Sequence, residues 1–142
     1  DGIHVNYPAA KVLLKAKGID KVMLITDSME ASGLEDGQYK IGNQAVYVKD
    51  NSARLESGTL AGSVLAMNRA VKNAHHHLGL TIYEAVRLAS YNPAKNLNLI
   101  DLGELAINKK ADIIMFDKDI NVDFVMIDGK VLIGEGNDNI KK

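Results

Sequence analysis

The feature that most constrains this chain is a short apolar run within residues 21–26, closed by Asp27. The run is too brief for a helix, and a continuous apolar run of this length is typical of a strand buried on both faces of a parallel sheet. Residues 5–16, just before it, carry apolar positions at helical spacing, with Pro8 in the first turn and Gly18 as the stop. A helix followed by a buried strand predicts an α/β unit.

Short strands joined by tight turns are predicted next. Residues 39–41 and 45–48 flank Gly42-Asn43, and Asp50-Asn51 marks a second turn, so a β-hairpin insertion is expected near residues 38–56. Two helices should follow. The first runs from Gly62 to about His77 and ends at Gly79, and its inner face is Val64, Met67, Val71, Ala74 and Leu78.

The second of these helices begins at a capping box formed by Thr81 and Glu84. Asn92-Pro93 either interrupts it or starts a new short helix through Leu97. The last part of the chain reads as strands at residues 111–116, 124–127 and 130–133, with Asp128-Gly129 as a hairpin signal, followed by a polar tail at residues 137–142.

Composition excludes several classes of function. Lys and Arg number 17 against 18 Asp and Glu, which is not the basic balance of a nucleic-acid binder. The chain has no cysteine, so disulfides, thiolate catalysis and cysteine-based zinc sites are excluded. No apolar run is long enough for a membrane span, and no signal-peptide pattern is visible, so we expect a soluble, cytoplasmic protein. The chain begins at Asp1 without methionine, which suggests a piece of a longer protein.

Asp27 is the sharpest candidate for chemistry. It follows the apolar run directly, and the carboxyl ends of strands in α/β folds are where ligands and catalytic groups gather. A carboxylate there can take a proton from a water molecule and pass it to a leaving group. The alternative is a turn or cap residue that accepts hydrogen bonds from backbone N–H groups.

His4 is the second candidate, because it also stands just before a helix and can donate a hydrogen bond to a substrate oxygen or act as an acid. A half-buried loop histidine is the alternative. Residues 58–63 carry glycines that lead into a helix, where backbone can approach a ligand, or they simply begin that helix. They are not a P-loop, because no lysine follows Gly62.

The run His75-His76-His77 resembles a metal site, but adjacent helix positions point about 100° apart and cannot converge on one ion. A solvated helix end, favoured by the helix dipole, is the preferred interpretation. These are three of the four histidines, which leaves His4 alone. We therefore expect no multi-histidine metal centre within this chain.

Several motifs together resemble the N-acetylglucosamine-6-phosphate deacetylases. Residues 25–33 (ITDSMEASG) are similar to that family's Thr-Asp-Ala-Met-x-Ala-x-Gly segment, and Asp-Gly-x-Tyr and Gly-Thr-Leu-Ala-Gly-Ser follow at residues 36–39 and 58–63. Residues 1–4 (DGIH) look like the family's Asp-Gly-x-His. Residues 88–94 and 102–112 continue the series, the latter in a form that many amidohydrolases share.

The resemblance implies the C-terminal part of a metal-dependent-hydrolase (β/α)8 barrel at residues 1–100, strands of a small β-sandwich domain at residues 101–136, and the polar tail. It implies removal of acetate from N-acetylglucosamine 6-phosphate, with Asp27 as the catalytic acid/base. His4 and the backbone of Leu60, Ala61 and Gly62 would bind the substrate. A divalent metal ion, with zinc expected, would be held by a glutamate and two histidines upstream of Asp1, and the enzyme would be a homodimer without nucleic-acid or membrane partners.

Two positions depart from the family pattern. Glu30 stands where a small residue is usual, and Asn108 replaces a glycine in a turn, which asparagine tolerates at positive φ. Two alternatives stay open. The chain could belong to another amidohydrolase that acts on a cyclic amide or a nucleobase, or it could be a non-catalytic folding fragment or binding module.

Overall fold

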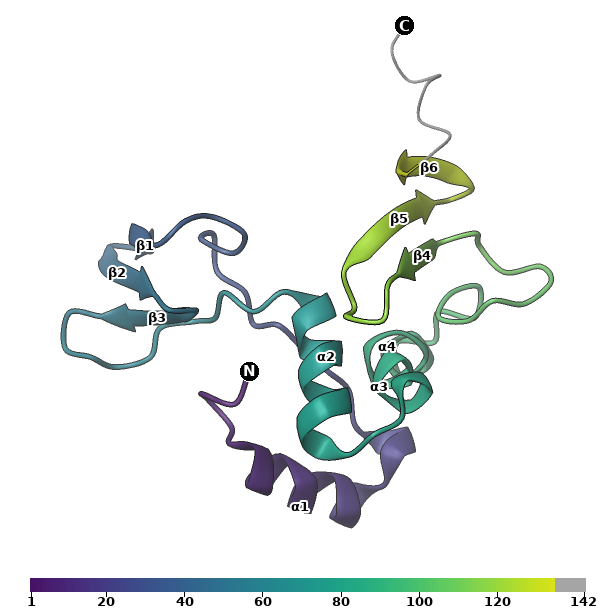
Figure 1. The fold of residues 1–142 in the computed structure, drawn as a ribbon, viewed down its shortest axis with the longest axis horizontal. Coiled ribbons are helices and arrows are strands. Elements are labelled where there is room, and N and C mark those ends of the chain that lie inside the picture. The colour runs from purple at the N-terminus through teal and green to yellow at the C-terminus, as the bar shows by residue number, and fades with distance from the viewer. Residues whose placement is uncertain (135–142) are drawn as a thin grey trace, which may run out of the picture.

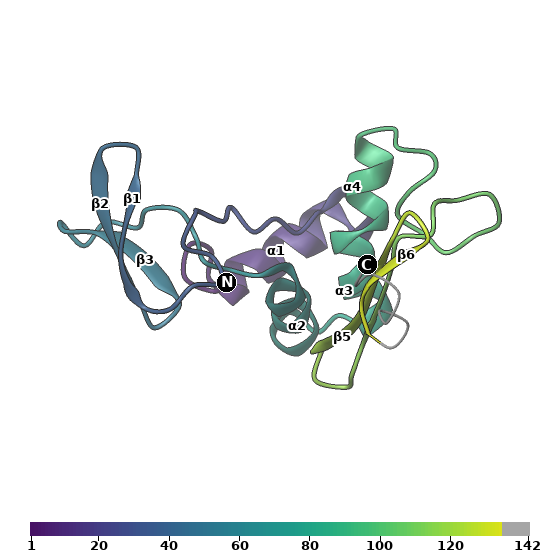
Figure 2. The ribbon, with the colours of Figure 1, turned by 90° about the horizontal axis from the view of Figure 1, so that it is seen from above.

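The computed structural model describes residues 1–134, so the predicted tail at residues 137–142 lies outside the described part of the chain. A three-stranded sheet lies at each end of an elongated arrangement, with the helices between them (Figures 1 and 2). The first sheet comprises β1 (Gly37–Ile41), β2 (Gln44–Lys49) and β3 (Ser52–Leu55), and the second β4 (Ile113–Phe116), β5 (Val122–Ile127) and β6 (Lys130–Ile133). The helices are α1 (Tyr7–Lys17), η1 (Ile19–Lys21), α2 (Met67–Leu78), α3 (Ile82–Ala89) and α4 (Tyr91–Asn96).

Local capping signals place most helix ends where the sequence predicts them. The Asn6 side chain accepts a hydrogen bond from the Ala9 amide, proline stands in the first turn of α1, and Gly18 caps its end. Both halves of the capping box of α3 are present. The proline region starts a new helix, α4, rather than interrupting α3.

The helix predicted from Gly62 begins later, at Met67, although it ends at Gly79 in the left-handed conformation as expected. Residues 62–66 are not helical, because Ser63 is engaged in a parallel bridge with Ser28. The Ser63 hydroxyl also accepts a hydrogen bond from the Leu65 amide. A backbone group committed to a strand partner cannot join a helix, so this start was predicted wrongly.

Both predicted sets of hairpins are present. In each sheet the strands are antiparallel and in sequence order, β1-β2-β3 and β4-β5-β6. Asp128 and Gly129 both have positive φ, as a two-residue hairpin turn requires. The second sheet is irregular, with register shifts at Met115/Phe116 and Val125/Met126.

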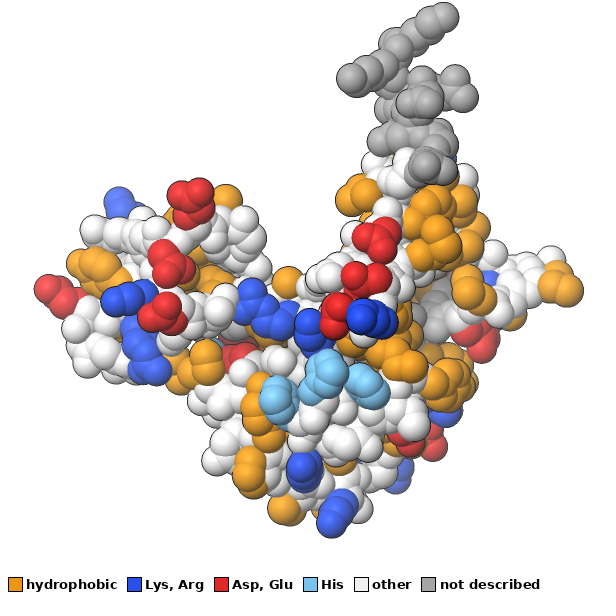
Figure 3. Space-filling model, in the orientation of Figure 1, with side chains coloured by type: hydrophobic (Ala, Val, Ile, Leu, Met, Phe, Trp, Pro, Cys, Tyr) orange, Lys and Arg blue, Asp and Glu red, His pale blue; other side chains and the backbone are white. Residues whose placement is uncertain are grey.

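Two small cores hold the structure. One lies under the first sheet and contains Ala31, Val46, Val48 and Ala53. The other lies between α2, α3 and the loop before β5, and its buried members are Val71, Ala74, Ala85 and Ile120. No residue of α1 is buried. Hydrophobic side chains therefore remain on the surface, including a group over β4–β6 (Figure 3).

The apolar run at residues 21–26 is not a strand, which corrects the opening prediction. Lys21 ends η1, Val22 is extended, and residues 22–27 belong to no strand ladder. Side chains alternate along the segment, and Ile25 is 74% exposed. A strand buried on both faces needs flanking strands and covering elements on each side. Within residues 1–134, the hydrogen bonds of this segment are few. The Leu24 amide donates to the Leu88 carbonyl (2.9 Å). The Val22 carbonyl accepts from the Asn92 side chain, and the Asp27 carbonyl accepts from the Ser63 amide.

The exposed surface is large for the size of the chain. It measures 10021 Å², whereas a compact monomer of 15.4 kDa exposes about 7,200 Å². None of the helices among the described residues is long and apolar enough to cross a membrane.

Candidate functional site

Asp27 lies at the point where the extended segment meets residues 58–63. Its backbone φ is 51°, in the left-handed region, where aspartate is one of the few side chains that is tolerated. The Asp27 carbonyl accepts a hydrogen bond from the Ser63 amide (3.0 Å), and the Met29 amide donates to the Ser63 carbonyl (2.8 Å). Asp27 is exposed, and no hydrogen bond to its carboxylate is recorded within the described residues. Within the described residues, the Asp27 carboxylate therefore does not act as a cap.

The backbone of Leu60, Ala61 and Gly62 is carried to Asp27 by the first sheet. Leu60 forms an antiparallel bridge with Arg54 of β3, and the Ala61 amide donates to the Ala53 carbonyl (3.0 Å). Beyond Gly62, the chain pairs with residues that follow Asp27: Ser63 bridges to Ser28, and the Ser28 hydroxyl donates to the Leu65 carbonyl (2.7 Å). The structure thus brings Asp27 and the loop before α2 together, although they are far apart in sequence.

Gly62 is required at the closest point of this crossing. Its φ is 69°, and a Cβ there would lie 3.3 Å from Met29 Cβ and from Ile41 Cδ1. Both the backbone conformation and the space favour glycine.

His4 lies in a separate turn beside α1. Its Nδ1 is hydrogen-bonded to the Asp1 carboxylate, and the ring is partly exposed. In the part of the chain that the structure describes, no hydrogen bond or ion pair joins His4 to Asp27 or to residues 58–63. The structure therefore joins Asp27 to residues 58–63 by hydrogen bonds, whereas His4 lies apart from both in its own turn.

Asn92 is a supporting residue that the sequence reasoning did not single out. It is 4% exposed, and its Nδ2 donates to the carbonyls of Ile19 and Val22, both at 2.7 Å. Its Oδ1 is buried without a partner. Asn92 ties α4 to the start of the segment that ends at Asp27. Asn92 lies in the motif at residues 88–94, which the sequence analysis used only as part of the family resemblance.

The histidine run is not a simple solvated helix end. His75 Nδ1 is hydrogen-bonded to the Leu80 carbonyl (2.7 Å), and the His77 ring stacks on Tyr7 with centroids 4.2 Å apart. Histidine side chains lie over α2 in Figure 3. No group of three or more His, Cys, Asp or Glu residues within residues 1–134 is arranged to hold a metal ion. The described residues therefore do not fit a metal centre.

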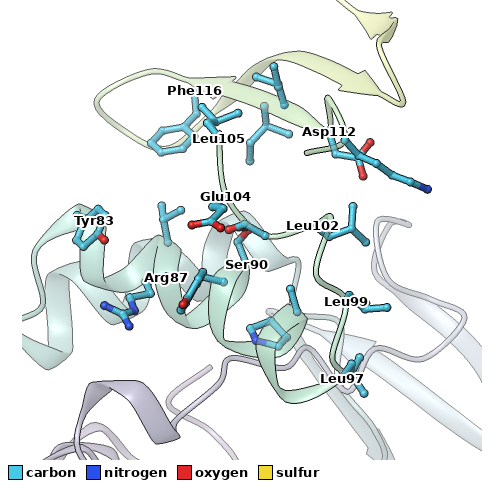
Figure 4. A pocket seen from close by; sticks show the side chains of 18 residues that line it. Tyr83, Arg87, Ser90, Leu97, Leu99, Leu102, Glu104, Leu105, Asp112 and Phe116 are labelled. Carbon is cyan, nitrogen blue, oxygen red and sulfur yellow. Dashed lines mark hydrogen bonds between the residues drawn. The ribbon is translucent and has the colours of Figure 1, made fainter. Parts of the chain in front are cut away.

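A separate pocket lies away from these residues. It has a volume of about 900 Å³ and opens between α3, α4, the loop after α4, and β4. Figure 4 shows Arg87 on α3, leucines of the loop and Phe116 on β4 around it. It contains neither Asp27 nor His4 nor residues 60–62. Its lining mixes apolar side chains with charged ones such as Glu104 and Asp112, and Arg87 is paired with Asp20 (2.5 Å). The pocket is therefore separate from the candidate site.

Two carboxyl groups with lowered pKa also lie outside the site. The backbone amide and then the hydroxyl of Thr81 hold the pKa of Glu84 below its usual value. The backbone and then the side chain of Asn121 do the same for the pKa of Asp117. Both are structural turns or caps.

Comparison with known proteins gives a consistent set of similarities. The model of the amidohydrolase family matches residues 2–132. An N-acetylglucosamine-6-phosphate deacetylase from Bacillus subtilis is 39% identical over 92% of this chain and 33% of its own length. A putative N-acetylgalactosamine-6-phosphate deacetylase from Escherichia coli is 36% identical over 92% of this chain and 78% of its own length.

Solved structures agree. The N-acetylglucosamine-6-phosphate deacetylase of Thermotoga maritima superposes with a TM-score of 0.86 at 40% identity, over 92% of this chain and 36% of that one. The enzyme of the same name from Pasteurella multocida gives a TM-score of 0.90 at 32% identity, over 94% and 35%. The chain spans about a third of the length of the first curated relatives that it matches.

Proposed function

We propose, since this chain belongs to the amidohydrolase family, that it carries the acid/base residue and part of the sugar-binding surface of a deacetylase acting on N-acetylglucosamine 6-phosphate. The observation that carries the proposal is the parallel bridge between Ser28 and Ser63, which joins the exposed Asp27 to the end of the segment that contains Leu60, Ala61 and Gly62. Relatives bearing that activity in their names match over nearly the whole chain.

Asp27 would take up one proton and then release it. Its carboxylate takes a proton from the water that attacks the acetyl carbonyl, and returns it to the nitrogen as the C–N bond breaks. The products are acetate and glucosamine 6-phosphate. An exposed carboxylate that no internal donor occupies is suited to this exchange.

A divalent metal ion, zinc by expectation, would supply a more acidic water and a polarised carbonyl. Because residues 1–134 do not offer a metal cluster, we assign its ligands to the two thirds of the relatives' length that this chain does not span. His4 and residues 60–62 would contact the sugar phosphate.

The architecture that fits this role is a part of a (β/α)8 barrel at residues 1–100 with strands of a small β-domain at residues 101–136. The large exposed surface and the apolar side chains on it support association with a second copy, and we propose a homodimer.

A chimera tests the function. Residues 1–134 replace the matching third of the Bacillus subtilis relative, and acetate release from both N-acetylglucosamine 6-phosphate and its galactosamine epimer is measured. The galactosamine sugar is included because of the Escherichia coli relatives. We expect turnover that falls at least about 100-fold in Asp27→Asn. A folded, metal-loaded chimera that hydrolyses neither sugar, or an Asp27→Asn chimera at near-parental rate, would overturn the proposal.

A further inference from the structure

Asp1 closes a tight turn around His4. One of its carboxylate oxygens, Oδ1, accepts hydrogen bonds from the backbone amides of Ile3 (3.0 Å) and His4 (3.1 Å). The other oxygen, Oδ2, is hydrogen-bonded to His4 Nδ1. The same carboxylate therefore shapes the backbone of the turn and holds the imidazole ring of its last residue.

Tyr7 and His77 hold this turn against the helices. The Tyr7 hydroxyl donates to the Asp1 carbonyl (3.2 Å). The Tyr7 ring covers Gly2 so closely that a Cβ there would lie 2.6 Å from Tyr7 Cζ. The Tyr7 ring also stacks on the His77 ring, nearly parallel to it at 18°. The turn is thus packed through Tyr7 onto the last turn of α2.

The chemistry of the Asp1–His4 contact fixes which nitrogen of the ring is free. An ionised carboxylate only accepts hydrogen bonds, so His4 Nδ1 must carry a proton. In the neutral ring the other nitrogen, Nε2, then has the lone pair and faces away from Asp1. We propose that Asp1 is a positioning residue, which holds His4 in the Nδ1–H tautomer and presents Nε2 to the ligand. The inference rests on the proposed function for the ligand, but its structural half stands on this geometry alone.

The tautomer can be measured directly by 15N NMR of the histidine rings in the full chain, at pH about 8.5, where imidazole rings are neutral. We expect the Nδ1–H pattern for His4. In Asp1→Asn, the amide oxygen keeps the two backbone donors and the NH2 group faces the ring, so the proton should move to Nε2. Asp117→Asn is the matched control, because Asp117 Oδ1 accepts two backbone amides and Oδ2 a side-chain donor in a turn far along the chain.

The outcomes separate the two proposals. An Nε2–H or mixed tautomer for His4 in the unaltered chain overturns the inference, even if Asp1→Asn fails to fold. An unchanged His4 tautomer in folded Asp1→Asn, or a shift in Asp117→Asn, overturns it as well. In the chimera, we expect Asp1→Asn to lower kcat/KM about 10- to 100-fold. An inactive parental chimera with the expected tautomer would refute the proposed function and leave the Asp1 inference intact.

Discussion

Replacing Asn92 with alanine should loosen the segment that presents Asp27. The Asn92 amide donates to the carbonyls of Ile19 and Val22, and it is among the most buried polar side chains of the described residues. Alanine supplies no donor and leaves both carbonyls without this partner. Because few other bonds hold residues 22–27, the change acts where the segment is anchored.

The magnitude follows from the hydrogen bonds. Loss of a donor to a part-buried carbonyl costs about 1–2 kcal/mol, so two lost bonds cost about 2–4 kcal/mol. Removal of the unpartnered Asn92 Oδ1 recovers about 1 kcal/mol of that sum. The expected loss in the free energy of unfolding is therefore about 2 kcal/mol, a factor of roughly 30 in the folding equilibrium.

Urea denaturation followed by circular dichroism measures this loss, with Asn96→Ala as the control. Asn96 is the exposed last residue of α4, and its replacement should change stability by less than about 0.5 kcal/mol. Hydrogen exchange of the Leu24 amide, which is bonded to the Leu88 carbonyl, should quicken in Asn92→Ala. An Asn92→Ala loss no larger than that of Asn96→Ala would refute the anchoring role.

Three further substitutions test separate features. Because φ of Asp27 is 51°, the free energy of unfolding of Asp27→Asn should lie within about 0.5 kcal/mol of the parent's, and that of Asp27→Ala about 1 kcal/mol below it. Equal urea midpoints for Asp27→Asn and Asp27→Ala would contradict this. Since hydrogen bonds from Thr81 lower the pKa of Glu84, its contribution to stability exists above its ordinary pKa of 4.5 and is lost as pH falls through the lowered value. Thr81→Ala should raise that pKa in a carboxyl 13C titration, and an unmoved curve would argue against the cap. Gly103→Ala should cost more than about 2 kcal/mol in thermal or urea unfolding, since its Cβ would lie 2.7 Å from a neighbouring methyl group at φ +90°, whereas Gly18→Ala meets only the strain of positive φ.

The elements that depend on local signals were predictable. The stop at Gly18, the capping box at Thr81, and the hairpin turn at Asp128 each need only residues within a few positions. The Gly18 amide donates to the Leu14 carbonyl, and the Thr81 and Glu84 side chains bond to each other's backbone amides. The positions of these elements followed from the sequence for that reason.

The contacts between distant segments were not predictable. The late start of α2 depends on Ser63 pairing with Ser28, and the stack of His77 on Tyr7 brings together positions at opposite ends of two helices. The absence of a strand at residues 22–27 has the same origin, because a strand is defined by its neighbours and not by its own apolar pattern. The resemblance identified Asp27 and His4, but it did not indicate how either is held.

The candidate site depends more on backbone than on side chains. Backbone bonds that most residues could make pair Leu60 and Ala61 with β3 and join Ser63 to Asp27, so the side chains of Leu60 and Ala61 carry little of the signal. Gly62 is different, because its φ is positive and a Cβ there would lie 3.3 Å from Met29 Cβ, so a larger residue would require its neighbours to shift. Asp27 combines both demands, since the position requires a left-handed backbone and the proposed chemistry requires a carboxylate. Few residues besides aspartate and asparagine tolerate the first demand, and of those two only aspartate can move a proton.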